Sequence, residues 1–248
     1  MRRFCFMLIC PFIFSLVSYA QTDSAVAKPW KSPFKKNYIR LGIDKLGGSL
    51  NTAVTPAQNI HEGNFGAGNG YTLEFGHIFY FLGRKKQRIF NAGLDWTIIS
   101  LAYNPLNKWE DYASKRNENV DMGTPFHVSA SSKLGPIIAV NPADKLVIEA
   151  RFQLTYALHY NTYEYYVDKG NNQIYLYGFD SDSYLDNRGM GTNIGATLRY
   201  GFFGFAVDWS NAKISTAYYL QENPQQEGIN GAEKVPYKHL QVKLSFTF

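Results

Sequence analysis

Residues 146–160 read LVIEARFQLTYALHY, and this stretch decides the fold. Apolar side chains occupy every second position from Leu146 to Tyr160, while Glu149, Arg151 and Gln153 lie between them. Successive side chains of a strand point to opposite faces, whereas an α-helix repeats about every 3.6 residues. The unbroken period of two therefore predicts one long β-strand with an apolar face and a charged face.

The C-terminal end repeats this alternation, with polar residues between the apolar positions Leu240, Val242, Leu244, Phe246 and Phe248. Runs of similar character, bounded by turn residues, predict further strands along the chain. These strands cover about residues 38–46, 70–81, 88–101, 126–140, 192–202 and 204–216.

The connections between these segments alternate in length. Residues 83–87, 141–144 and 201–204 form tight turns, whereas residues 47–69, 102–125, 161–191 and 217–236 form long polar loops. Such alternation is typical of barrels that span an outer membrane. Residues 37–248 are thus predicted to form an all-β, eight-stranded antiparallel up-and-down transmembrane β-barrel, with short periplasmic turns and four long extracellular loops.

The N-terminus has the three parts of a secretory signal peptide. Two arginines precede an apolar run, and Ser18 and Ala20 are the small residues of a cleavage site. Residues 1–20 are therefore predicted to be removed, residues 21–36 to form a periplasmic tail, and the outer membrane to be the location. Both cysteines, Cys5 and Cys10, leave with the signal, so the mature chain has no thiol.

The polar faces of the predicted strands carry five basic and five acidic residues. A ring of eight strands is only wide enough to be filled by side chains. Because an unpaired buried charge is costly, these residues are expected to form a salt-bridge network that closes the lumen. The predicted lumen network consists of Arg40, Asp44, Glu74, Asp95, Lys133, Glu149, Arg151, Arg199, Asp208 and Lys243.

Charges and aromatic residues also distinguish the two ends of the predicted barrel. Acidic residues outnumber basic ones in the long loops, while the tail and tight turns are basic. Basic turns suit the phosphates of outer-membrane lipids and lipopolysaccharide, and an exported basic chain is not expected to bind nucleic acid. Outer-side tyrosines are predicted to mark a membrane interface. They are Tyr156, Tyr160, Tyr218, Tyr219 and Tyr237.

The third long loop predicts a β-hairpin, since residues 162–167 and 173–179 alternate around a polar turn. Its tyrosines suit a contact surface for a protein partner, although packing against neighbouring loops is an equal alternative. The hairpin would give ten strands instead of eight if it entered the membrane. The contact candidates are Tyr163, Tyr165, Tyr166, Tyr175 and Tyr177.

The C-terminal alternation, with its terminal aromatic residue, resembles that of small outer-membrane β-barrel proteins of the OmpA/OmpX type, especially the single-domain barrels of Bacteroidetes-like bacteria. The resemblance covers the signal peptide and residues 37–248. It implies that Leu240, Val242, Leu244, Phe246 and Phe248 form the signal read by the barrel-assembly machinery. It also implies roles in adhesion, envelope integrity, resistance or secretion.

His127 and Ser129 resemble the His-x-Ser pair of outer-membrane lipid A deacylases, but Ala130 stands where those enzymes have asparagine. The chain is therefore not predicted to be an enzyme. The five histidines show no pair at metal-ligand spacing, so no metal and no cofactor are predicted, and His159 and His239 are expected to join the polar network.

The function expected from the sequence is that of a closed, non-enzymatic barrel. It would act through its surface loops or as an accessory subunit of an envelope assembly. A narrow porin-like channel for small solutes and a lipid A-modifying hydrolase are the alternatives.

Overall fold

The computed structural model describes residues 32–82, 89–170, 173–179, 187–223, 225 and 227–248. The predicted signal peptide, most of the predicted tail and the whole of the first tight turn lie outside these residues. Within them the chain is all-β apart from two short helices, and its strands form one antiparallel sheet.

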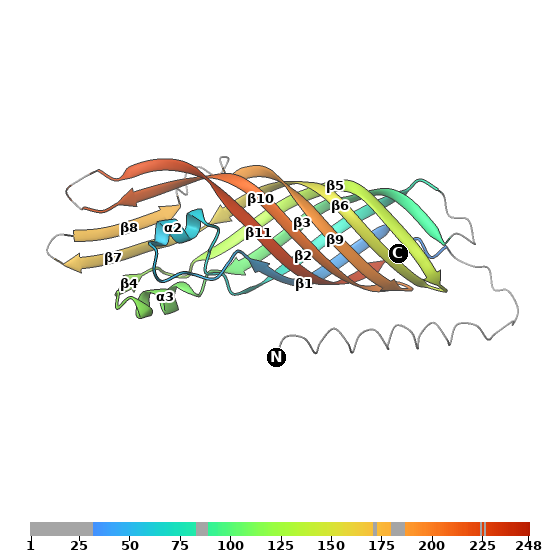
Figure 1. The fold of residues 1–248 in the computed structure, drawn as a ribbon, viewed down its shortest axis with the longest axis horizontal. Coiled ribbons are helices and arrows are strands. Elements are labelled where there is room, and N and C mark those ends of the chain that lie inside the picture. Colours follow the sequence, from blue (N-terminus) through green and yellow to red (C-terminus); the bar gives the residue numbers. More distant parts are fainter. Residues whose placement is uncertain (1–31, 83–88, 171–172, 180–186, 224, 226) are drawn as a thin grey trace, which may run out of the picture.

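Eight strands of this sheet close into a ring whose strands run obliquely to its long axis (Figure 1). Every neighbouring pair is antiparallel, and the ring closes because β11 pairs with β1 on one side and β10 on the other. The ring strands are β1 (Asn37–Leu46), β2 (Asn69–Tyr80), β3 (Phe90–Pro105), β5 (Phe126–Ala143), β6 (Leu146–Asn161), β9 (Arg188–Tyr200), β10 (Phe203–Gln221) and β11 (Ile229–Thr247).

Strand alternation gives the ring a buried polar interior and an exposed apolar exterior. Along β6 the residues from Val147 to Asn161 are buried at every odd position, and exposed or half-buried apolar side chains lie between them. The C-terminal strand behaves in the same way, with Leu240, Leu244 and Phe248 exposed around buried polar residues. The predicted faces of the strands are confirmed by this pattern.

A β-bulge in β3 changes which side chains face inward. The register with β5 shifts between Thr97 and Ser100, so Ile98 and Ile99 are both exposed. A bulge adds one residue to one strand and so reverses its alternation. As a result Ser100 and Asn104 point into the ring.

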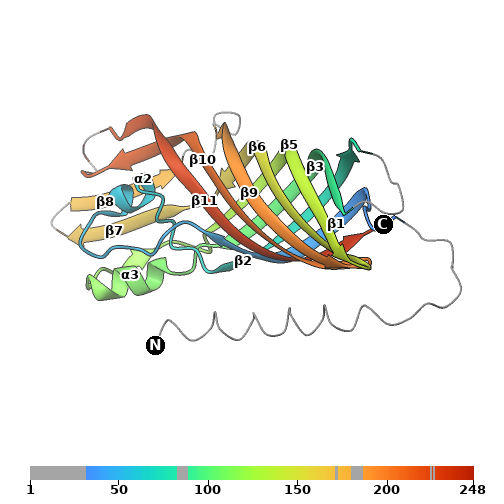
Figure 2. The ribbon, with the colours of Figure 1, turned by 45° about the vertical axis from the view of Figure 1, so that its right-hand side comes forward.

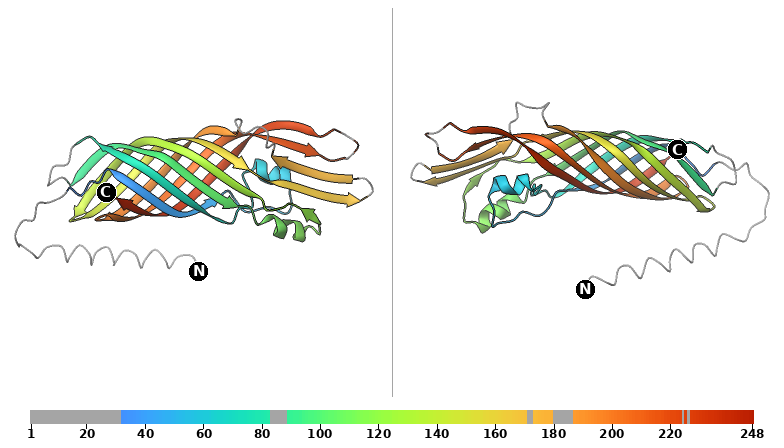
Figure 3. Two further views of the ribbon diagram at one scale, coloured as in Figure 1. Left: turned by 180° about the vertical axis from the view of Figure 1, so that it is seen from behind. Right: turned by 45° about the horizontal axis from the view of Figure 1, so that its top comes forward.

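A second region, here called the cap, covers one end of the ring (Figure 2). The cap lies at the end of the ring opposite the C-terminus (Figure 3). The hairpin β7–β8 joins the sheet through β10, outside the ring, so the hairpin adds strands to the cap and none to the ring. The cap consists of α2 (Pro56–His61), α3 (Trp109–Lys115), β4 (Val120–Asp121), β7 (Glu164–Gly170), β8 (Gln173–Phe179) and the adjoining ends of β10 and β11.

The prediction of a fourth long loop over residues 217–236 is wrong. The pairing of β10 with β11 continues through Tyr218 and Gly231 to Leu220 and Ile229, leaving residues 222–228 as the connection. The consecutive residues Tyr218, Tyr219 and Leu220 interrupt the alternation. They are strand nonetheless, because β8 pairs with them on the other side.

The two tight turns that the structure describes, between β5 and β6 and between β9 and β10, lie at the end of the ring opposite the cap (Figure 1). In the turn from Tyr200 to Phe203, Gly201 takes a left-handed backbone conformation with a φ of 64° that suits glycine. Neither helix of the described residues has the length and apolar character needed to cross a membrane.

Candidate functional site

Glu74 lies at the centre of the charges inside the ring. Its Oε1 accepts a hydrogen bond from the Lys133 ammonium at 2.6 Å, and its Oε2 forms an ion pair with the Lys243 ammonium at 2.8 Å. Ser100 also donates to Oε1 at 3.1 Å, and the Arg40 guanidinium lies 3.7 Å from Oε2. One carboxylate therefore holds three cations from three different strands.

Asp208 forms a second centre beside the first. The Arg151 guanidinium donates to both of its oxygens, at 2.6 Å to Oδ2 and at 3.0 Å through Nε to Oδ1. Lys243 also contacts Asp208, at 2.5 Å, and so joins it to Glu74. Gly195 leaves room for this pair, because a Cβ there would lie 1.9 Å from Asp208 Oδ1.

The other predicted network residues also have partners inside the ring. Arg199 pairs with Glu149 at 3.0 Å, and Tyr38 donates to Asp95 at 2.8 Å while its ring lies 3.7 Å from the Arg40 guanidinium. The structure thus places all ten predicted network residues in the interior, where ion pairs link seven of them into one cluster, while Glu149 pairs with Arg199 and Asp44 pairs with His239. Those buried residues are Arg40, Asp44, Glu74, Asp95, Lys133, Glu149, Arg151, Arg199, Asp208 and Lys243.

Three histidines meet at the boundary between the ring and the cap. His127 of β5, His159 of β6 and His239 of β11 are all buried, and each offers a ring nitrogen within 4.8 Å of the others. His127 Nε2 and His159 Nδ1 are hydrogen-bonded at 2.8 Å. The expectation of scattered histidines is wrong for these three, because ring closure brings β11 opposite β5 and β6.

Polar side chains of β1 and β3 orient two of these histidines. Asp44 Oδ2 lies 2.8 Å from His239 Nδ1, and Asn104 Oδ1 lies 3.4 Å from His127 Nδ1. Asn104 in turn donates to the backbone carbonyl of Asp44 at 3.2 Å. The Asp44 carboxylate therefore orients His239. It does not orient His127, which is the residue that resembles the base of a hydrolase.

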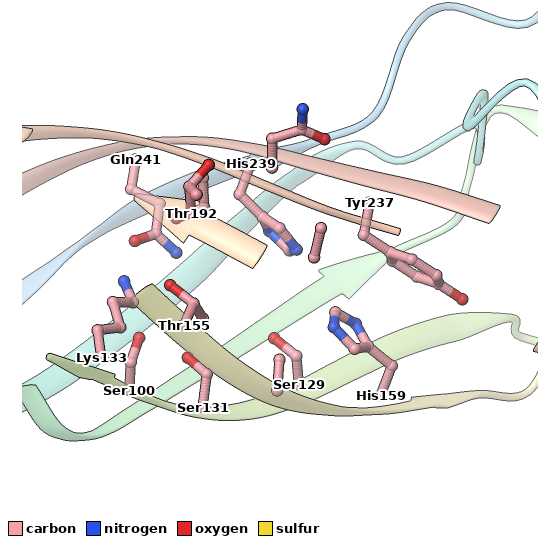
Figure 4. Close-up of a pocket in the computed structure, with 14 residues that line it drawn as sticks. Ser100, Ser129, Ser131, Lys133, Thr155, His159, Thr192, Tyr237, His239 and Gln241 are labelled. Atoms are coloured by element: carbon pink, nitrogen blue, oxygen red, sulfur yellow. The ribbon is translucent and has the colours of Figure 1, made fainter. Parts of the chain in front are cut away.

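A small cavity of about 30 Å³ adjoins the histidines (Figure 4). Figure 4 shows His159 and His239 projecting into it from different strands, with Ser129 and Tyr237 beside them. About 10–15 Å³ of such space holds one water molecule. The cavity thus has room for about two waters, and it is lined mostly by hydroxyl and amide groups.

The cap has an aromatic core, which corrects the predicted contact surface of the hairpin. Tyr163, Tyr165, Tyr175 and Tyr177 are buried, and only Tyr166 is partly exposed. The buried tyrosines surround Trp109 and Tyr112 of α3 and pack with Phe65 of the first loop. They face inward because the helices cover that side of the hairpin.

Two buried polar groups of the cap are hydrogen-bonded, whereas the buried Tyr163 hydroxyl has no hydrogen-bond partner among the described residues. Trp109 donates to the Phe65 carbonyl at 2.8 Å, and Tyr165 donates to Glu118 at 2.6 Å. Burial raises the pKa of Tyr112 to about 12, and burial together with Glu118 raises the pKa of Tyr165 further. Both phenols therefore stay protonated donors at neutral pH.

Tyr237 departs from its predicted place among the outward-facing tyrosines. It is buried and its ring centre lies 4.2 Å from that of His159, while Phe65 stacks on it at 4.6 Å. Phe65 and Tyr237 thus cover the histidines on the side of the cap.

A groove of about 640 Å³ opens where the cap meets β1, β2 and β3. Its charged lining residues are Lys45, Lys108, Asp111 and Lys115, which give it a positive balance. Lys108 and Lys115 flank α3, and Lys45 comes from the rim of the ring.

Comparison with known proteins finds no matching family model and no matching curated protein. The sequence alone placed the network residues on one face of their strands. It missed the histidine cluster, for which the only signal is that all three histidines occupy inward positions of their strands.

Proposed function

We propose that this protein is an outer-membrane β-barrel with a closed lumen, which acts through its cap on the outer face of the cell. The observation that carries the proposal is the reversed distribution of polarity in the ring. Large apolar side chains such as Leu154, Phe205 and Leu244 are about half exposed on its outside, and ion pairs fill its inside. Such a surface is stable when hydrocarbon surrounds it.

The interior favours a closed lumen over the alternative of a solute channel. Lys243 joins Glu74 and Asp208 across the interior, and the cavity beside the histidines holds about two waters. Phe65 and Tyr237 cover the interior at the cap. These contacts leave ligand recognition to the cap, whose lysine-bearing groove suits an anionic group such as a lipid phosphate.

The membrane part of the proposal is tested by substitution on the outside of the ring. Leu154→Arg is expected to destabilise the refolded protein by about 2–4 kcal/mol in lipid vesicles, the cost of arginine near a bilayer midplane. Leu154→Met is the matched control and should have little effect. Urea unfolding followed by heat-modifiable gel migration measures both. A mature protein that stays in solution without detergent would contradict the proposal.

The closed lumen is tested by conductance in planar bilayers. The unaltered protein is expected to give no steady channels. The triple variant Glu74→Ala, Lys133→Ala and Lys243→Ala should give steady channels of small conductance. Steady nanosiemens channels from the unaltered protein would reject the closed lumen.

The role of the groove is tested by the combined variant Lys45→Gln, Lys108→Gln and Lys115→Gln. It should retain less lipopolysaccharide through purification than the unaltered protein, while Lys234→Gln, an exposed lysine of β11, should retain the same amount. Equal retention by both variants would remove the groove from the proposal.

A further inference from the structure

The three buried histidines form a set that the lumen ion pairs do not explain. They come from opposite walls of the ring, because β5 and β6 are neighbours while β11 lies several strands away in either direction. The register places Ser129 opposite His159, so His127 and His159 are diagonal neighbours on one face of the sheet. Their ring centres lie 5.1 Å apart, and that of His239 lies 5.7 Å and 6.1 Å from them.

This spacing suits one tetrahedral metal ion. Zinc binds imidazole nitrogens at about 2.0–2.1 Å, so three such nitrogens lie about 3.3 Å from each other around the ion. The three histidine nitrogens already lie within 4.8 Å of one another. Small side-chain rotations therefore complete the site without any change in the strands.

The surroundings prepare two of the nitrogens for a metal. Asp44 accepts a hydrogen bond from His239 Nδ1, which leaves the lone pair of Nε2 free. Asn104 Oδ1, as an acceptor, likewise favours a proton on His127 Nδ1, so Nε2 is the unprotonated nitrogen and accepts from His159 Nδ1. A carboxylate or carbonyl on the second ring nitrogen is the usual outer partner of a metal-bound histidine.

The third histidine shows an incomplete set of contacts. His159 Nε2 is buried and has no hydrogen-bond partner among the residues that the structure describes. Its Nδ1 shares a proton with His127 Nε2 across 2.8 Å. Buried polar atoms are nearly always satisfied, so Nε2 calls for a water of the adjoining cavity, and Nδ1, which faces His127, is the nitrogen that can bind an ion.

We propose that His127, His159 and His239 bind one Zn²⁺ ion, with Asp44 and Asn104 as the outer partners that orient His239 and His127. The ion replaces the proton shared by His127 and His159, and His159 then carries its N–H on Nε2. A water from the adjoining cavity supplies the fourth ligand, since that cavity reaches both His159 and His239. Bound in this way, the ion links β5 and β6 to β11 directly beneath the cap.

Metal titration of the refolded, chelator-treated full-length mature chain in detergent tests this site. Isothermal titration is expected to give one Zn²⁺ per chain, and Co²⁺ should give the intense visible bands of a tetrahedral complex. His159→Gln and His239→Gln should abolish both signals. His77→Gln, which alters a histidine outside the cluster, should leave them unchanged.

The outer partner provides a variant that keeps all three histidines. Asp44→Asn should weaken Zn²⁺ binding by about 10- to 100-fold, the usual effect of losing such a partner. Heat-modifiable migration verifies that each variant is folded, and it does not depend on the metal. No binding by the unaltered protein, or undiminished binding by the His159→Gln and His239→Gln variants, would overturn the proposal while leaving the membrane proposal intact.

Discussion

The ring and the cap bury opposite kinds of side chain with the same strands. The inward face of β11 shows the change within a few residues, because Val235 and Tyr237 lie in the aromatic core whereas Gln241 and Lys243 lie among the ion pairs. His239 stands between the two regions. The proposed membrane explains the difference, since polar groups turn inward in hydrocarbon and apolar groups turn inward in water.

The largest expected effect comes from Glu74→Leu, which leaves three buried cations without their carboxylate. We expect a loss of about 5 kcal/mol in the free energy of unfolding, the upper end of the range for a broken buried ion pair. Urea titration of the refolded protein measures it. Glu164→Leu, at an exposed position of the cap hairpin, should change stability by about 0.5 kcal/mol or less. Similar losses at the two sites would remove the distinction between interior and surface.

Tryptophan substitution compares the two regions with one chemical change. Trp109→Ala should cost about 3–4 kcal/mol of cap stability, because it opens a cavity in the aromatic core. Trp209→Ala, on the exposed face of the ring, should cost about 1 kcal/mol or less, because lipid takes the place of the side chain. Limited proteolysis of the cap and urea unfolding of the ring separate the effects. A loss at Trp209 as large as that at Trp109 would show that other side chains pack around it.

A smaller effect is expected from Gly195→Ala inside the ring. The added methyl group would contact Asp208 and the Arg151 guanidinium, so the ion pair must shift. Overpacking of this kind costs about 1–3 kcal/mol. Gly178→Ala, where a Cβ meets its nearest neighbour at 3.3 Å in the cap, provides the comparison and should cost less. The urea midpoints of unfolding of the two variants measure this difference. A Gly195→Ala variant as stable as the unaltered protein would mean that the ion pairs are loosely packed.

The smallest effect is expected from Thr55→Ala at the start of α2. Thr55 accepts from the Gln58 backbone and forms a capping box with that residue. Loss of this cap costs about 1 kcal/mol. Faster hydrogen exchange in residues 56–61, with no change in the ring strands, is the expected result. An equal change in the ring would indicate that cap and ring unfold as one unit.

The strands of the ring could be predicted from the chain because alternation is a local property. Residues 146–160 show both faces of β6 in their order alone, and the same reasoning placed Arg40, Glu74 and Asp208 on inward faces. Within the cap, alternation predicted the hairpin but left open which side of it would be covered. Trp109 and Tyr112 decide that, and they belong to a helix about 50 residues earlier.

The sequence by itself determined the position of the eight ring strands and the polar face of their regular parts, because side-chain direction follows from the backbone of a single strand, but it missed the extension of β10 and β11 into the cap. Only the tertiary structure decided which inward side chains meet. Asp44 and His239 are 195 residues apart and come together through ring closure, and the bulge in β3 turns Asn104 toward them. Register, bulges and closure depend on partner strands, and so the sequence places the three histidines on inward faces without showing that they meet.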